Sequence, residues 1–163
     1  MATMKPFPQA GFLSYLELQS GSASRTAMAT LSPELAGMLC DDAGQPGKAA
    51  NPLLQLLQTR KAMWQTAFET QQVADDLRRY QKFAKPGQPS PHIVQLRQQQ
   101  GAVRQASSRA RQQFIAAAAA FVREAGIAVP PRVALEAFVT RWIDIHIPAD
   151  VAAPSWVTAS AAS

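Results

Sequence analysis

The sequence is poor in the residue types from which most active sites and disulfide-stapled folds are built. Its 163 residues include one cysteine, Cys40, so no internal disulfide bond can form, which fits a reducing compartment. The two histidines, His92 and His146, lie far apart in the chain, and too few other metal ligands surround either of them. Phosphate-loop, serine-nucleophile, zinc-protease and dinucleotide-binding motifs are absent. The sequence therefore predicts a non-enzyme with no catalytic residues, no metal and no cofactor.

Long hydrophobic runs are also missing. The best run, residues 115–122, is mostly alanine and falls well short of the roughly 18 residues of a membrane span. The first residues lack the apolar stretch of a secretory signal. We therefore expect a soluble, cytoplasmic protein without a membrane span. Two alternatives stay open, namely leaderless export through the Ser/Thr/Ala-rich first 30 residues and incorporation into a virion.

Aromatic residues make up only 7% of the chain, whereas hydrophobic residues make up 47%. The core should therefore be mostly aliphatic and alanine, which buries little area per residue and favours an elongated shape or a need for partners. The length suits one domain. We divide the chain into an N-terminal segment, 1–30, that is poorly ordered or docks on the core, a helical domain, 31–147, and an Ala/Ser-rich tail, 148–163.

Two long uninterrupted helices are indicated in the middle of the chain. Asn51-Pro52 combines a capping side chain with a proline that needs no N–H partner at a helix start, and Ser90-Pro91 repeats the combination. The first helix should continue until Lys85-Pro86-Gly87, and the second until Gly126. The sequence thus predicts helices over residues 52–84 and 91–125.

The second of these helices carries a heptad seam, in which apolar or small residues alternate in steps of three and four. The seam is apolar at both ends and small or polar in its middle, around Gln100 and Ser107. The short connection over residues 85–89 requires the two helices to pack antiparallel. The predicted fold class is therefore all-α, a long antiparallel helical hairpin with one or two shorter helices and flexible termini. The seam residues expected to point most clearly inward are Leu96, Val103, Ala110, Phe114 and Phe121.

Shorter elements are expected on either side of the hairpin. Ser32-Pro33-Glu34 is a good helix start, for a helix that ends near Cys40. An apolar cluster over residues 12–18 could dock as a short helix or a strand. Residues 133–145 read as a third helix, followed by a short extended exit, and Trp156 suggests that the tail docks. The segment before this third helix loosely resembles a helix-turn-helix turn, but consecutive prolines and Arg132 argue against that motif.

The positive charge is concentrated in one segment. Residues 78–123 contain nine basic residues and no acidic residue, although the net charge of the whole chain is only +5. On the second helix an apolar residue followed by Arg-Gln recurs every seven positions. This spacing places three arginines, Arg97, Arg104 and Arg111, in a ridge at intervals of about 10 Å. These nine residues are the candidate binding site: Arg78, Arg79, Lys82, Lys85, Arg97, Arg104, Arg109, Arg111 and Arg123.

Three interpretations of this charge compete. The arginines could pair with acids of the neighbouring helix, but only Glu69, Asp75 and Asp76 are expected within range, so surplus charge should remain. That surplus could bind nucleic-acid phosphates, or it could bind an acidic protein surface or neighbouring subunits. The first function hypothesis is therefore a nucleic-acid-binding module. The second is an assembly protein, such as a chaperone, adaptor or structural subunit of a phage or secretion complex, that uses the same hairpin for protein contacts. Under either hypothesis the weak middle of the seam predicts a homo-oligomer or hetero-complex. The preference for Arg over Lys suggests a bacterial or phage source.

Overall fold

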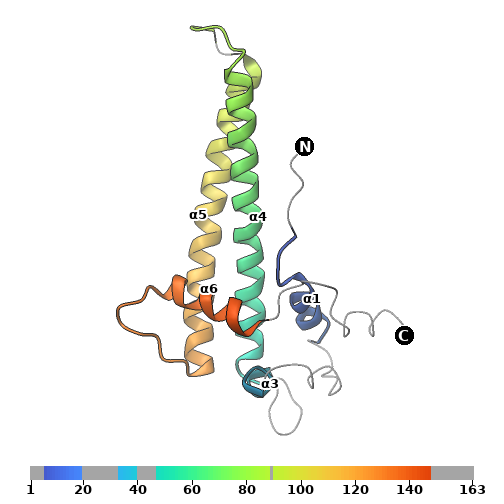
Figure 1. Cartoon of the computed structure of the whole chain (residues 1–163), viewed down its shortest axis with the longest axis vertical. Coiled ribbons are helices and arrows are strands. Elements are labelled where there is room, and N and C mark those ends of the chain that lie inside the picture. The colour runs from blue at the N-terminus through green and yellow to red at the C-terminus, as the bar shows by residue number, and fades with distance from the viewer. Residues whose placement is uncertain (1–5, 20–32, 40–46, 89, 148–163) are drawn as a thin grey trace, which may run out of the picture.

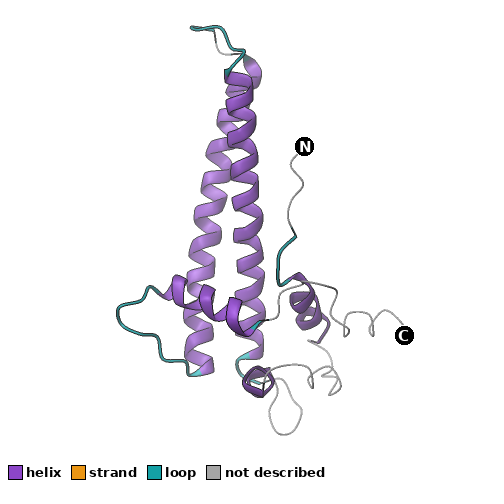
Figure 2. Cartoon of the chain, in the orientation of Figure 1, coloured by secondary structure: helices purple, strands orange, loops and turns teal. Residues whose placement is uncertain are grey.

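The computed structural model describes residues 6–19, 33–39, 47–88 and 90–147 of the chain. Every regular element in these ranges is a helix, which confirms the predicted all-α class (Figure 2). A long hairpin dominates the molecule, and the short helices gather around its lower end in Figure 1. In chain order the helices are α1 (Ala10–Gln19), α3 (Pro33–Leu39), α4 (Ala50–Gln81), α5 (Pro91–Ala125) and α6 (Leu135–His146).

The predicted hairpin is confirmed by α4 and α5, which run antiparallel and pack along their length (Figure 1). They contain 32 and 35 residues, so each is about 50 Å long. We call the end of the hairpin near α1, α3 and α6 the base, the end at residues 80–88 and 90–92 the tip, and the part between them the stalk. The tip projects far from the other helices (Figure 1).

The boundaries of α4 differ from the prediction at both ends. The helix begins at Ala50, with Ala49 as its N-cap and no side-chain cap, so Asn51 lies inside the first turn instead of capping it. At the other end it stops at Gln81, and Phe83 and Ala84 donate to the carbonyls of Tyr80 and Gln81 in tighter turns. The predicted end at residue 84 is therefore three residues too late.

Both ends of α5 follow the prediction. The Ser90 side chain accepts a hydrogen bond from the Ile93 backbone N–H at 3.3 Å, and Pro91 opens the helix. Gly126 ends it in the left-handed conformation, with φ of 67°, and its N–H donates to the Val122 carbonyl.

The main hydrophobic core lies at the base. Leu53, Leu56 and Leu57 of α4 meet Phe114 and Phe121 of α5, and all five side chains are fully buried. The short helices cover this core with apolar side chains of their own: Phe12, Leu13 and Leu16 of α1, Leu35 and Leu39 of α3, and Val139, Trp142 and Ile143 of α6. The base is thus a small globular unit that holds one end of the hairpin.

The three short helices, α1, α3 and α6, lie where the sequence predicted short elements. The apolar cluster after Phe12 forms a helix, α1, and packs on α4. Glu34 lies in the first turn of α3 as predicted, whereas Ser32, the expected cap, is outside the described residues. The third helix, α6, continues to His146, one residue beyond the prediction, and Ile147 then adopts the expected extended conformation. Trp156 and the tail also lie outside the described residues.

The seam of α5 is well packed at its two ends and loosely packed in the stalk. A second, smaller cluster of Leu77, Ile93 and Leu96, with Ala84 against it, holds the helices together near the tip. Between this cluster and the base, Gln100, Val103 and Ser107 are only half-buried. Val103 is therefore less buried than expected, whereas the other four residues predicted to point inward are buried. The middle of the seam is therefore loosely packed, as the sequence predicted.

Candidate functional site

The nine basic residues of the candidate site all have exposed side chains, and we call them the basic surface. Lys82 and Lys85 lie at the tip, where α4 ends, and Arg78 and Arg79 lie in the last turn of α4. The other five are distributed along α5, with Arg97 near the tip and Arg123 in the last turn at the base. The basic surface therefore follows the hairpin from its tip to its base.

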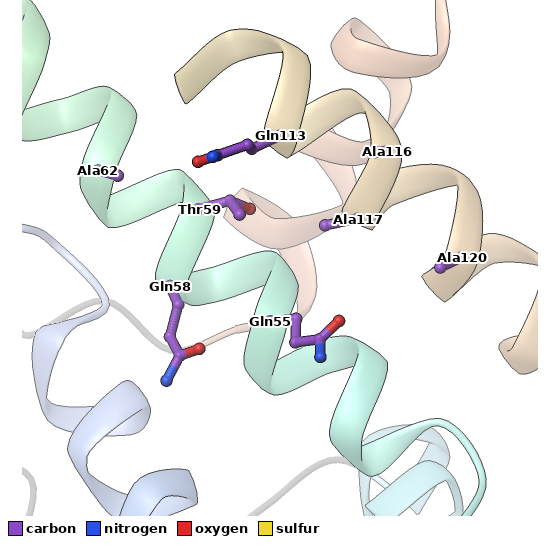
Figure 3. Close-up of a pocket in the computed structure, with 8 residues that line it drawn as sticks. All are labelled: Gln55, Gln58, Thr59, Ala62, Gln113, Ala116, Ala117 and Ala120. Atoms are coloured by element: carbon purple, nitrogen blue, oxygen red, sulfur yellow. The ribbon is translucent and has the colours of Figure 1, made fainter. Parts of the chain in front are cut away.

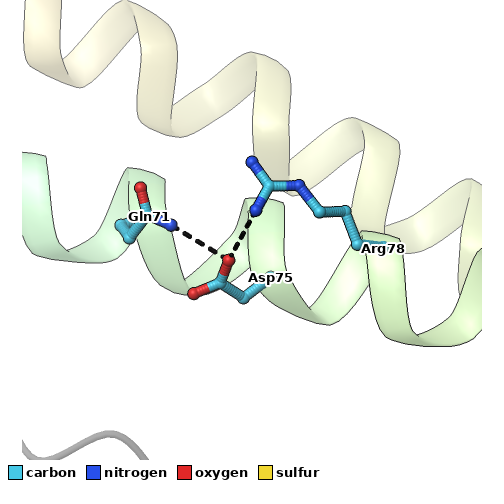
Figure 4. A network of polar contacts seen from close by, with 3 residues as sticks. All are labelled: Gln71, Asp75 and Arg78. Atoms are coloured by element: carbon cyan, nitrogen blue, oxygen red, sulfur yellow. Dashed lines mark hydrogen bonds and ion pairs between the residues drawn. The ribbon is translucent and has the colours of Figure 1, made fainter.

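Two arginines of the basic surface are partly neutralised by acids of their own helix. Arg78 forms an ion pair with Asp75 at 3.1 Å, and Gln71 donates to the same carboxylate at 2.9 Å (Figure 4). Arg79 lies 4.0 Å from Asp76. Both arginine side chains remain 70% exposed, so these pairs contribute little to stability and leave the guanidinium groups open to solvent.

Arg111 is paired across helices, which the sequence did not predict. Its Nε and one terminal nitrogen both lie 2.9 Å from Glu136 Oε2, so α5 is tied to α6. Glu136 was not expected near Arg111. The two residues meet because the chain after Gly126 brings α6 back across α5, and this path cannot be read from the sequence. Arg123 lies 3.8 Å from the adjacent Glu124. Among the ridge arginines, Arg111 is therefore the one that helps to hold α6 against α5.

The remaining members of the basic surface have no ion-pair partner among the residues that the structure describes. We call them the unpaired group: Lys82, Lys85, Arg97, Arg104 and Arg109. Arg97 and Arg104 share the seven-residue spacing of Arg111, so they continue along the same flank of α5 above α6. Arg109 lies on the other flank, because it follows the seam residue Ser107 by two positions. The ridge therefore consists of Arg97 and Arg104, which have no ion-pair partner among the described residues, and Arg111, which is paired with Glu136.

The tip combines positive charge with exposed aromatic side chains. Tyr80 of α4 contacts His92 of α5 edge-on, with ring centroids 4.3 Å apart, and this contact joins the two helices at the tip. Phe83 is 83% exposed, the largest value among the exposed large hydrophobic residues of the described chain. Burying such a ring would contribute roughly 1.5–3 kcal/mol, so Phe83 offers a ligand an apolar surface that the fold itself leaves unused. Phe83 was not among the predicted site residues, because the predicted helix over residues 52–84 included it.

A shallow groove lies on the other flank of the hairpin, near the base. It has a volume of about 490 Å³ and is open to solvent. Small side chains form its floor and glutamines its rim, and α6 passes behind the two helices (Figure 3). Arg109 lies one turn above Gln113 on the same stripe of α5, at the upper end of the groove. The lining residues are Gln55, Gln58, Thr59, Ala62, Gln113, Ala116, Ala117 and Ala120.

The described residues contain no cluster of three or more His, Cys, Asp or Glu side chains that could hold a metal ion. His146 contacts Glu34 at 3.5 Å and the Trp142 carbonyl at 3.1 Å. The connection between α5 and α6, residues 126–134, is longer than the roughly three- to four-residue turn of a helix-turn-helix. Within the described ranges, no helix is long and apolar enough to cross a bilayer.

Comparison of the chain with protein-family models, with curated proteins and with solved structures finds no match in any of the three.

Proposed function

We propose that this protein is a non-catalytic binding module that engages the phosphate backbone of nucleic acid through the distal part of its hairpin. The observation that carries the proposal is the unpaired group, whose five exposed cations have no ion-pair partner in the described chain. Four of the nine basic residues have partners, so the fold leaves a net excess of charge on the tip and stalk. Such an excess favours binding to a polyanion, with the release of its counterions.

The shape of the hairpin also bears on how it would bind. Two packed helices, each about 10 Å across and about 9 Å apart, are too wide for the roughly 12 Å major groove that admits one helix. The basic side chains would therefore meet phosphates along the outside of a duplex or along a single strand. Affinity should then depend steeply on salt and weakly on sequence.

The test compares two triple variants that remove the same charge. The first, Lys82→Gln/Arg97→Gln/Arg104→Gln, removes three members of the unpaired group. The control, Lys61→Gln/Arg132→Gln/Arg141→Gln, removes three exposed cations outside the basic surface, none of which has an ion pair within the described ranges. Glutamine is a good helix former, so both proteins should keep their helicity.

We expect the first variant to lose affinity for duplex DNA and to shallow the slope of log affinity against log salt by about 0.9 for each lost phosphate contact. The control should keep the wild-type slope, since its charges lie elsewhere. A gel-shift series over salt measures both. Wild-type protein that binds neither DNA nor RNA at ~50 mM salt would contradict the proposal.

A second function, that of an assembly protein, is favoured by the loosely packed stalk and the groove. Gln100, Val103 and Ser107 leave the seam only half-filled, and the small side chains of the groove would let another helix approach closely. Under this alternative a protein partner remains bound after nuclease treatment of the purified material. Under the first proposal, nuclease removes what co-purifies at low salt.

A further inference from the structure

The tip of the hairpin carries a combination that phosphate binding alone does not require. Phe83 is almost fully solvated, and it lies between Lys82 and Lys85 in the chain. Tyr80, 44% exposed, lies three residues before it. A purely electrostatic contact with phosphates would be served by the lysines without an exposed ring. The ring therefore points to a ligand that offers an apolar or aromatic surface next to negative charge.

The tip is also a firm support for this ring. Ser90 caps α5 at the tip, the Tyr80–His92 contact joins the two helices, and Ile93 is buried in the small cluster with Leu77 and Leu96. The Phe83 N–H donates to the Tyr80 carbonyl at 3.2 Å, which fixes the backbone that carries the ring. An exposed side chain on an anchored backbone can contact a ligand with little loss of conformational entropy.

We infer that the tip binds unpaired bases, with Phe83 stacked on a base and Lys82 and Lys85 on the flanking phosphates. The ligand class is thus single-stranded nucleic acid, or the unpaired bases at a junction or frayed end. This inference rests on the proposed function and narrows it. A single strand offers base faces next to phosphates, and the tip offers a ring with a lysine on either side of it in the chain. In a closed duplex the base faces are already stacked on one another, so Phe83 would find no partner there.

The other ligands that combine apolar surface with negative charge fit the tip less well. A stable protein interface buries about 800 Å² on each partner, and the convex end of two helices offers much less than that. Peripheral membrane binding relies on a large apolar face in addition to charge, and here one ring is strongly exposed. A single base, by contrast, is matched in size by a single phenyl ring.

The experiment measures fluorescence anisotropy of labelled oligodeoxythymidine of about 20 nucleotides, and of a blunt duplex of equal length, at ~50 mM salt. Four full-length variants are compared with the wild type: Phe83→Ala, Phe83→Leu, Phe83→Trp and Ile145→Ala. Ile145 is the matched control, because it is an exposed large hydrophobic residue, 68% exposed, on α6 away from the tip. Phe83→Leu keeps an apolar side chain but removes the ring.

The wild type should bind the single strand more tightly than the duplex. Phe83→Ala and Phe83→Leu should weaken single-strand binding on the order of tenfold, leave duplex binding unchanged and keep the salt slope, since stacking releases no counterions. Phe83→Trp and Ile145→Ala should bind like the wild type. Circular dichroism should show the same helicity for all five proteins.

Several results would overturn the inference. If Phe83→Ala binds both ligands as the wild type does, the tip does not stack on bases, and the proposed function still stands. Full retention of single-strand affinity by Phe83→Leu would show that the ring is not needed. Binding to phosphatidylserine-containing vesicles that depends on Phe83, without any effect on the single strand, would assign the tip to lipid. Failure of the wild type to bind either oligonucleotide would overturn the proposed function as well.

Discussion

At the scale of single residues, two phenylalanines of one chain have opposite surroundings. Phe114 is completely buried at the base, where Arg60 lies over its ring at 6.0 Å, whereas Phe83 is 83% exposed at the tip. Phe114 is followed by the apolar run over residues 115–122, whereas Phe83 lies between Lys82 and Lys85, so local composition already separates the two rings. The seam spacing also identifies Phe114, because it lies in register with Ala110 and Phe121.

This contrast predicts different effects of the same substitution. Phe114→Ala should lower the free energy of unfolding by about 3–5 kcal/mol, because it leaves a cavity in the base core. Phe83→Ala should change it by no more than about 0.5 kcal/mol, since the ring makes little buried contact. Urea denaturation followed by circular dichroism measures both. Equal losses in the two variants would show that Phe83 packs against the fold, contrary to its exposure.

The candidate site was only partly predictable at this scale. The charge block over residues 78–123 is visible in the sequence, and its nine side chains are all exposed as their composition suggests. The partner of Arg111 was not predictable, because Glu136 is 25 residues away and reaches it through the path of a loop. Phe83 was missed for a local reason: α4 ends at Gln81, so the ring leaves the helix that was expected to carry it.

At the scale of the elements, a glycine inside α5 and the glycine that ends this helix have opposite roles. Gly126 ends the helix with φ of 67°, a conformation that residues with a Cβ adopt at a cost. Gly101 lies in the middle of the same helix, is exposed, and has nothing within 4 Å of the position of a Cβ. One glycine is required by the backbone, and the other only weakens the helix.

The substitution of alanine should therefore change stability in opposite directions at the two positions. Gly101→Ala should stabilise the protein by about 0.5–1 kcal/mol, because alanine restricts the unfolded chain and suits a helix interior. Gly126→Ala should destabilise it by about 1 kcal/mol, owing to the positive φ. Thermal unfolding of each variant gives the sign. A Gly101→Ala protein that melts below the wild type would indicate that another chain packs closely against that face.

Helix ends with a specific chemical signal were predicted better than ends without one. Ser90-Pro91 and Gly126 fixed α5 to the residue, because a hydroxyl cap, a proline and a left-handed glycine each act locally. Asn51 misled the prediction at the start of α4, because the helix already begins at Ala50, with Ala49 as its N-cap. The end of α6 has no such signal, because the alternating apolar residues Ile143, Ile145 and Ile147 fit the period of a strand as well as the end of a helix.

At the scale of the whole molecule, stability is divided between two clusters of unequal size. The base combines side chains from all the described helices, whereas the tip cluster consists of three buried residues, Leu77, Ile93 and Leu96. The half-buried stalk residues between them contribute little hydrophobic stabilisation. The tip is therefore connected to the base mainly by the continuous backbones of α4 and α5, and less by side-chain packing in the stalk.

We therefore predict that the stalk opens without unfolding of the base. Native-state hydrogen exchange should show lower protection for residues 66–75 and 99–108 than for residues 53–57 and 114–121, because the former can open by breaking few buried contacts. Ser107→Leu adds an apolar side chain to the half-filled seam and should slow exchange in the stalk about fivefold, corresponding to roughly 1 kcal/mol of added burial. Ser108→Leu, at the neighbouring exposed position, is the matched control and should leave stalk exchange unchanged. Equal protection of stalk and base in the wild type would instead mean that the hairpin unfolds as one cooperative unit.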